Sequence, residues 1–553
     1  MTLSQSFYII IYRVWLKGMI YMSDKGFTLV ELLAVIIILG VIALITVPIV
    51  TNIVDKAEND AEIAGVKQYI NAVEDYLLSA NANENTMIKD GTCIIKSDSS
   101  VVCGTKSFSV ETKNNKVTSG ILTIQDYSVV KASKLKLGGN IYSIDSDGEV
   151  SVETPLNISK PILFNNTLTP VIYSDGNWIV ADSSEIWYDY ETQWWANAVL
   201  LKNSKNVGDI VNVDGFDSDI YAMYVWVPRY EYKIQGDYGK SGTSTTIPGE
   251  IEVNFISKEK TTPSTGYHIN SGFTFGNTNL SGIWVGKFET SHMTLSTSTN
   301  DNNLGCSNEN CTNADGLRIL PNVQALRRNN NSNFFYASRS MGRSGNPFGI
   351  NSSLTDSHMM KNSEWGIAAY LSQSKYGKYG NSDYNGVNKE IYINNSSSRY
   401  TGRSGGTAAA NSENKNYTYN VDINGTGAST TGNIYGIYDM NGGSWERTMA
   451  NYNGYLGSSG FSTLPASKYY DRYTTNIGAS ACNGTCYGHA VSETANWYSD
   501  FYMRDGKDLA QSTPWIGRSG GYSDTVQAGI FYINGHNGAA SAGYSFRLVL
   551  TEP

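Results

Sequence analysis

The chain has 553 residues, of which 41% are hydrophobic and 12% aromatic; it is too long for a single core and too apolar for a disordered protein. Its net charge of −9 argues against a general nucleic-acid binder, which needs a basic surface. Only 16% of the residues are charged, and Asn, Ser, Thr, Gly and Tyr supply much of the polarity, which is common in extracellular β-rich modules.

Residues 27–50 form an apolar run whose single charge is that of Glu31. At ~1.5 Å per residue, a helix of this length can cross a bilayer. A plain single-pass anchor does not explain the carboxylate, because a charge inside the membrane costs about 2–3 kcal/mol and usually has a function. The pattern therefore predicts a membrane helix in which Glu31 has a role.

The stretch KGFTLVELLAVIIILGVIALITVP (residues 25–48) resembles the N-terminus of type IV pilins and of the pseudopilins of type II secretion and competence systems. In that family a prepilin peptidase cuts after the glycine, here Gly26, and N-methylates the new first residue, here Phe27. The resemblance also matches Glu31, expected to pair with the N-terminal amine of a neighbouring subunit because a buried charge needs a partner. It matches Pro48 as well, which is expected to kink or locally melt the helix.

The resemblance makes residues 1–26 a leader. This leader is longer than is usual in the family, and a start at Met22 would give the short leader MSDKG, so we expect translation to begin there. Beyond Pro48, apolar residues recur at three- and four-residue steps, which predicts one helix over residues 27–80. Its first half is expected to lie in lipid as a transmembrane and assembly helix, and its second half to pack on a sheet.

Residues 81–155 contain short runs rich in β-branched residues with turn signals between them, which predict a small β domain. A long helix followed by a three- to five-stranded antiparallel sheet resembles the pilin fold. An unrelated β domain on a stalk is the alternative.

The six cysteines fall into three close pairs, which predict three local disulfides in an oxidising compartment. A zinc site built from the last two pairs is the alternative, although no nearby histidine supports it. The pairs are Cys93 with Cys103, Cys306 with Cys311, and Cys482 with Cys486.

The rest of the chain is expected to form a linker and Trp-rich segment (residues 156–215) and then a large domain (residues 216–553). Segments of the large domain, taken in order, resemble the formylglycine-generating-enzyme/sulfatase-modifying-factor fold, a relative of C-type lectins. The expected fold class is therefore α+β: a long helix with a small pilin-like sheet, followed by a large, irregular lectin-like domain. The segments are YAMYVWVPRYEYKI from Tyr221, GIWVGKFETS from Gly282, MMKNSEWGIAAYL from Met359, GIYDMNGGSWERT from Gly436, GRSGGYSD from Gly517 and GYSFRLVL from Gly543.

Several residues of these segments have expected structural roles. Trp445 is expected to fill the core, and Gly443 with its neighbour Gly442 to allow a tight turn. Arg518 and Arg547 are expected to be buried or half-buried forks that bind carboxylates or carbonyls.

The domain is not expected to be an enzyme. Formylglycine-generating enzymes depend on late cysteines that bind copper, whereas the matching ending has Ser519 and Ser545, and Cys482 and Cys486 look like a loop staple. The sequence also lacks a Gly-rich phosphate loop and the HExxH motif. A membrane-anchored enzyme that resembles the sulfatase-modifying factors is the alternative.

Ligand binding fits the long polar loops better, because variable loops on a rigid frame are where function tends to lie. The tail AGIFYINGHNGAASAGYSFRLVL resembles the variable region of retroelement-diversified lectin-fold proteins, in which aromatic and Asn positions form the ligand face. Ordinary β-hairpin positions are the alternative. The candidates are Tyr522, Phe531, Tyr532, Asn534, His536 and Asn537.

A calcium site is a further hypothesis. The segment that carries Asp439, Asn441 and Glu446 resembles a calcium-binding stretch of the lectin-fold family, and oxygen ligands suit calcium. Such clusters are more often turn chemistry.

Together these features predict a pilin-like or pseudopilin subunit that presents an adhesin-like C-terminal domain. Its expected partners are prepilin peptidase, other pilin subunits, membrane lipid and a surface glycan or protein ligand, with no nucleic acid. It would lie in the cell membrane as a single-pass protein and then in an extracellular filament, at a minor or tip position, because a region of ~400 residues is bulky. A minor pseudopilin of a type II secretion or competence machinery, with a structural C-terminal domain, is the alternative. The Asn- and Tyr-rich composition suits a Gram-positive bacterium of low GC content.

Overall fold

The structure is a computed structural model with two compact units, Met1–Gln68 and Tyr69–Pro553. The predicted processing residues Gly26 and Phe27 and the predicted disulfide partner Cys482 lie outside the described residues. The described residues are 29–81, 86–104, 106–112, 116–153, 156–234, 248–293, 303–409, 415–474, 486–503 and 509–553.

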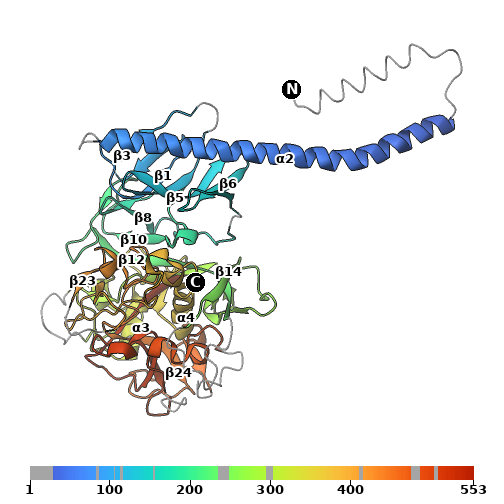
Figure 1. Cartoon of the computed structure of the whole chain (residues 1–553). Helices are drawn as coiled ribbons and strands as arrows, with labels where there is room; N and C mark the ends of the chain where they lie inside the picture. The colour runs from blue at the N-terminus through green and yellow to red at the C-terminus, as the bar shows by residue number, and fades with distance from the viewer. Residues whose placement is uncertain are drawn as a thin grey trace, which may run out of the picture. The chain divides into compact units, whose positions relative to one another are not determined.

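One long helix, α2 (Leu29–Asn81), carries the N-terminal part of the chain (Figure 1). It matches the predicted helix within the described residues. It runs through Pro48 without a break, so of the two expected effects of Pro48, a kink or local melting, local melting is wrong. An interior proline costs about 3 kcal/mol, which the many other backbone bonds of a 53-residue helix can offset.

A helix that crosses a membrane must be both long and apolar. Among the residues that the structure describes, no helix combines the necessary length with the necessary apolarity. The predicted transmembrane helix is therefore not confirmed.

The C-terminal turns of α2 pack on an antiparallel sheet in the order β3-β2-β1-β4-β5-β6-β7 (Figure 1). Tyr69, Val73 and Leu77 of the helix are buried, and the Tyr69 hydroxyl donates to the Ser99 carbonyl at 3.0 Å. With seven strands in the described residues, the sheet is larger than the three to five strands predicted. The strands are β1 (Gly91–Ile95), β2 (Ser100–Cys103), β3 (Lys106–Ser109), β4 (Gly120–Gln125), β5 (Ser128–Leu137), β6 (Asn140–Ile144) and β7 (Val150–Val152).

The C-terminal region is built around an antiparallel sheet in the order β11-β9-β8-β10-β12-β18-β29-β21. Residues 169–211, predicted to belong to the linker and Trp-rich segment, supply four of its strands. The last strand of the chain, β29, lies between β18 and β21. The strands are β8 (Thr169–Ser174), β9 (Asn177–Val180), β10 (Asn197–Leu201), β11 (Ile210–Val211), β12 (Ile220–Pro228), β18 (Gly282–Gly286), β21 (Asp356–Met359) and β29 (Leu548–Thr551).

A second sheet has the order β25-β24-β26-β27, and β28 also pairs with β24. Its strands are β24 (Trp445–Tyr452), β25 (Asp471–Tyr473), β26 (Trp515–Ser519), β27 (Gly529–His536) and β28 (Tyr544–Phe546). The helices are α3 (Asn331–Ser340), α4 (Asn362–Ser372) and the short α5 (Ile423–Thr426). Smaller sheets contain β13 (Tyr230–Ile234), β14 (Ile251–Phe255), β15 (His268–Ile269), β16 (Thr274–Phe275), β17 (Thr278–Asn279), β19 (Ser291–His292), β20 (Leu317–Arg318), β22 (Arg403–Ser404) and β23 (Tyr417–Thr418).

Aromatic side chains form much of the core of the C-terminal region. Trp178, Trp187, Trp194 and Trp195, which the sequence clusters before the large domain, are all buried. The dense tryptophans therefore build a β-rich core. The predominance of sheet with a few helices agrees with the predicted α+β class.

Candidate functional site

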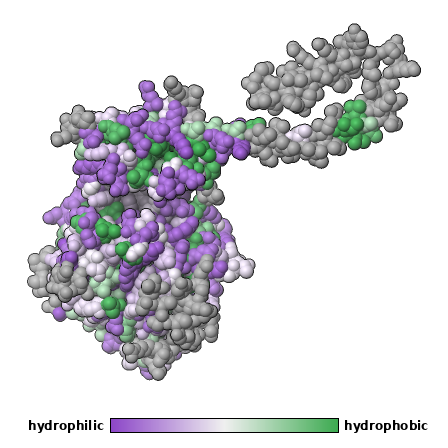
Figure 2. Space-filling model, in the orientation of Figure 1, coloured by the Kyte–Doolittle hydropathy of each residue, from purple (hydrophilic) through white to green (hydrophobic). Residues whose placement is uncertain are grey.

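The N-terminal part of α2 exposes a row of apolar side chains, which Figure 2 shows as a hydrophobic patch near the start of the helix. Exposed apolar patches commonly mark contacts with another protein or a membrane. Glu31 and Pro48, the predicted assembly residues, lie in the same helix. The exposed residues are Leu33, Val35, Ile36, Ile37 and Ile38, each 44–58% exposed.

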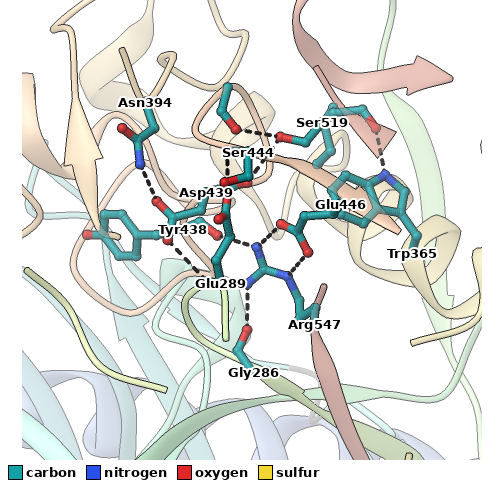
Figure 3. Close-up of polar contacts among 12 residues, drawn as sticks. Gly286, Glu289, Trp365, Asn394, Tyr438, Asp439, Ser444, Glu446, Ser519 and Arg547 are labelled. Atoms are coloured by element: carbon teal, nitrogen blue, oxygen red, sulfur yellow. Dashed lines mark hydrogen bonds and ion pairs between the residues drawn. The ribbon is translucent and has the colours of Figure 1, made fainter. Parts of the chain in front are cut away.

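A buried ion pair lies at the centre of the C-terminal region (Figure 3). Arg547 Nε donates to Glu446 Oε2 at 2.9 Å, and Arg547 Nη2 donates to the other carboxylate oxygen. The remaining guanidinium donors reach the carbonyls of Gly286 at 2.7 Å and Tyr438 at 2.9 Å. Arg547 is thus the buried fork that the sequence predicts, and it ties three separate segments together.

Glu289 lies beside this ion pair and is also fully buried. A Cβ atom on Gly443 would lie 2.6 Å from Glu289 Oε1, and Gly443 has a φ of 68°, so glycine alone fits the turn. Burial raises the pKa of Glu289 well above its usual range, and the charges of Glu446 and Asp439 raise it further. Burial also raises the pKa of Glu446 to about 7, against the effect of Arg547. Three carboxylates thus share one buried region with the Arg547 guanidinium.

The three predicted calcium ligands have protein partners. Asp439 accepts a hydrogen bond from Asn394 Nδ2 at 2.8 Å, and Glu446 is paired with Arg547. Asn441 Nδ2 donates to two backbone carbonyls. Within the described ranges, no group of three or more His, Cys, Asp and Glu residues is arranged to hold a metal. The structure therefore gives no support to the calcium hypothesis, because these side chains are used to build the turn.

Three of the six predicted ligand residues are buried. Phe531 is 1% exposed and packs edge-to-face on Trp497 with ring centroids 5.1 Å apart. Tyr532 and His536 are 6% and 8% exposed, and burial lowers the pKa of His536 well below its usual range. These three assignments to a ligand face are wrong, because their part of β27 is covered by other chain segments. The other three reach the surface: Tyr522, Asn534 and Asn537.

Two further residues test the structural roles predicted from the sequence. Trp445 is only half-buried, so its predicted place in the core is wrong; its Nε1 donates to Asp524 Oδ2 at 3.0 Å. Arg518 is fully buried and donates to the carbonyls of Tyr532 at 2.9 Å and Ala490 at 2.7 Å, as a buried fork should.

Disulfides join Cys93 to Cys103 and Cys306 to Cys311, the pairs that their spacing predicts. Cys486 is disulfide-bonded as well, and no cysteine of the described residues is free. An oxidised cysteine cannot supply the thiolate that zinc requires, so the alternative of a zinc site is not supported.

A cleft of about 830 Å³ opens between the seven-stranded sheet and the C-terminal region. Its volume lies within the range of about 300–1,000 Å³ that is usual for ligand sites. The walls come from β5, β6, the segment after β7, residues 186–192, the end of β14 and residues 375–376. Because these segments are far apart in the chain, no local motif reveals the cleft.

A bulge in β5 fixes the floor of the cleft. The strand register shifts between Ala132 and Leu135, and Lys134 has a φ of 53°. Lys134 Nζ donates to the Tyr188 carbonyl at 3.0 Å and lies 3.3 Å from Asp189 Oδ1. The bulge therefore projects Lys134 onto the turn at Asp189 and ties the two sides of the cleft together.

The cleft is lined by both basic and acidic side chains that a ligand could contact. Lys131 and Lys160 are exposed on its rim. Burial raises the pKa of Glu153 and of Glu191 above the usual value, and it raises the pKa of Tyr188 to about 12. Ammonium, carboxyl and phenol groups beside apolar side chains suit recognition of a polar ligand, with a few polar groups fixing its orientation.

A buried histidine in the C-terminal region has two carboxylate partners. His358 Nδ1 lies 2.9 Å from Asp356 Oδ1, and Nε2 lies 3.1 Å from Glu364 Oε1. Burial lowers the pKa of His358, but the two carboxylates outweigh it, and the net shift is upward. The ion network therefore adds stability that is fully present below the unfolded pKa of about 6.5 and is lost as the pH rises through the folded pKa.

We expect His358→Gln to lower the free energy of unfolding by about 1–3 kcal/mol at pH 5.5, because buried carboxylate partners lose charged donors. The loss should be smaller at pH 8.5, where the wild-type imidazole is closer to neutral. Urea unfolding of both proteins at both pH values measures this difference, and shifts of other groups largely cancel in the comparison. Equal losses at the two pH values would contradict the assignment.

Comparison with known proteins shows a match at the N-terminus. The family model described as the prokaryotic N-terminal methylation motif matches residues 21–47. Among solved structures, the Treponema denticola variable protein 1 is similar over 60% of this chain and 96% of its own, with 12% identity and a TM-score of 0.22. That TM-score is too low to support an argument about the fold.

The match confirms the prepilin-like N-terminus that the sequence predicts, and the motif includes Gly26, Phe27 and Glu31. The match covers residues 21–47 of the 553-residue chain, so it characterises the N-terminus and not the C-terminal region.

Proposed function

We propose that this chain is a pilin-like surface subunit that carries a ligand-binding domain at the end of its assembly helix. The observation that carries the proposal is the methylation motif at residues 21–47, which continues directly into α2. Prepilin peptidase would cut after Gly26 and methylate Phe27. The helix would rest in the membrane before assembly and against neighbouring subunits afterwards.

The exposed row of apolar side chains on α2 supports this role, because such a surface needs either lipid or other helices to cover it. The disulfides support it as well, since disulfides persist mainly outside the reducing cytosol. Both features suit a protein that starts in the membrane and works at the cell surface.

The finer part of the proposal is that the C-terminal region is a lectin-like adhesin domain and a binding module, with a surface glycan or protein as its ligand. Two sheets and the buried Arg547–Glu446 pair give it a rigid frame. Segments on which the lectin-like resemblance rests form β12, β18, α4, β24, β26, β28 and β29 of this frame. The cleft floored by Lys134 is the candidate ligand site.

The assembly role is tested by Glu31→Leu. We expect the variant to lose its leader normally but to fall about tenfold or more in the sheared surface fraction, because a buried charge pair between subunits is worth several kcal/mol. Quantitative blotting of sheared and membrane fractions measures the change. Glu58→Leu, at an exposed position of α2, is the matched control and should behave as wild type. A Glu31→Leu chain as abundant in the sheared fraction as wild type would contradict the proposed assembly.

A further inference from the structure

Three arginines from two loops come together in the C-terminal region; we call Arg327, Arg328 and Arg399 the arginine cluster. The backbone amide of Ala325 donates to the Arg399 carbonyl at 3.0 Å, which holds the two loops side by side. The amide of Arg328 donates to the Ser541 carbonyl at 3.0 Å, which attaches the Arg327–Arg328 loop to the segment before β28. In a chain of net charge −9, this concentration of positive charge needs an explanation.

The backbone holds two of these arginines in an unusual conformation. Arg328 has a φ of 59° and Arg399 a φ of 54°. The left-handed region is unfavourable for a non-glycine residue, and residues held there are often found at binding and catalytic sites. The surrounding hydrogen bonds thus hold both side chains in positions that the loops would not adopt alone.

The arginines are close enough to repel one another. Burial lowers the pKa of Arg327, and the charges of Arg399 and Arg328 lower it further, while Glu289 opposes them. Arg327 Nη1 donates to the Ala542 carbonyl at 3.0 Å, so this innermost member is anchored to the frame. The repulsion would be relieved by an anion bound among the three side chains.

The outer face of the arginine cluster is accessible. Arg328 and Arg399 are half-buried, and the Arg399 guanidinium carbon lies 4.9 Å from the ring centre of Tyr522, which is half-buried too. None of the ion pairs among the described residues joins Arg399 to a carboxylate. Tyr522 would therefore orient a guanidinium fork that no carboxylate of the described residues pairs with.

We propose that the arginine cluster, with Tyr522, binds a single oxyanion group, a carboxylate or a sulfate, carried by a ligand of the C-terminal domain. Guanidinium groups match planar oxyanions with paired hydrogen bonds. A long polyanion such as a nucleic acid fits less well, because the net charge of −9 repels it outside the cluster. This site is separate from the cleft floored by Lys134, and its existence does not depend on leader processing.

Saturation-transfer NMR on the purified full-length protein tests the site at matched ionic strength. The three sugar probes are glucuronic acid, galactose 6-sulfate and neutral galactose, and inorganic sulfate is added as a competitor. We expect the two acidic sugars to bind, neutral galactose to give no specific signal, and sulfate to displace the acidic sugars. Arg399→Gln and Arg328→Gln should each weaken binding about tenfold, as expected for losing a charged hydrogen bond. Arg472→Gln, at an exposed arginine, is the matched control and should bind as wild type.

Urea unfolding of each variant distinguishes loss of the binding site from loss of the fold. The binding of a less stable variant is measured without urea, at a temperature at which that variant is fully folded. Equal binding of galactose and galactose 6-sulfate would overturn the proposal. Wild-type affinity in both Arg399→Gln and Arg328→Gln would overturn it too. Failure of the Glu31→Leu prediction would leave this inference standing, because the readout here is ligand binding by purified protein.

Discussion

Replacing Arg547 by Met is expected to lower the free energy of unfolding by about 3–5 kcal/mol at pH 7. The substitution leaves the Glu446 carboxylate buried without its cation, beside Asp439 and Glu289. It also removes the donors to the carbonyls of Gly286 and Tyr438. Urea unfolding of the purified chain, followed by tryptophan fluorescence, measures the loss.

The double variant Glu446→Leu/Arg547→Met is the control for this prediction. Removing both charges of a buried pair is often close to neutral, so the double variant should be more stable than Arg547→Met alone. It should not regain wild-type stability, because the two backbone carbonyls still lack donors. A loss below about 1 kcal/mol in the single variant would show that the ion pair is not a main support of the frame.

Replacing Trp365 by Ala is expected to cost a similar amount, about 3–5 kcal/mol, because it opens a large cavity beside the first turn of α4. Trp365 is fully buried, and its Nε1 donates to the Ile530 carbonyl at 2.8 Å. The loss therefore combines missing apolar contacts with a buried carbonyl that has no donor. The same urea unfolding experiment measures it.

Two variants make this second prediction specific. Trp365→Phe keeps part of the volume but loses the Nε1 donor, so its stability should lie between wild type and Trp365→Ala. Tyr455→Ala removes an aromatic ring that is 37% exposed and should change stability by about 0.5 kcal/mol or less. If Trp365→Ala and Tyr455→Ala cost the same, the buried Trp365 would not be a main support of the fold.

The features of this protein that could be predicted from sequence are those that depend on a short, contiguous stretch of residues. The motif around Gly26, Phe27 and Glu31 is contiguous, and the family match confirms it. The disulfides Cys93–Cys103 and Cys306–Cys311 follow from spacing alone. Periodicity over several turns likewise predicts α2.

The ligand surface was harder to predict because burial depends on what covers a strand. In β27 the burial runs unbroken from Gly529 to Ile533. Trp497 covers Phe531, and Trp365 lies against the Ile530 backbone. The apolar run IFYI in β27 does not by itself reveal which segments cover its two faces.

The cleft and the arginine cluster escaped prediction for a related reason. The residues of the cleft come from seven separate segments, and Arg328 and Arg399 meet only through a pairing of distant loops. The signal that could have drawn attention to the cluster is the pair Arg327-Arg328 in an acidic chain. Nothing local to that pair indicates Arg399 as its neighbour.

The central claim is that this chain is a processed pilin-like subunit, and N-terminal peptide mass spectrometry of protein recovered from the native cell surface tests it most directly. The account predicts a mature chain whose first residue is N-methylated Phe27. A surface chain that retains residues before Phe27 would contradict it and would leave a binding module without the pilin mechanism.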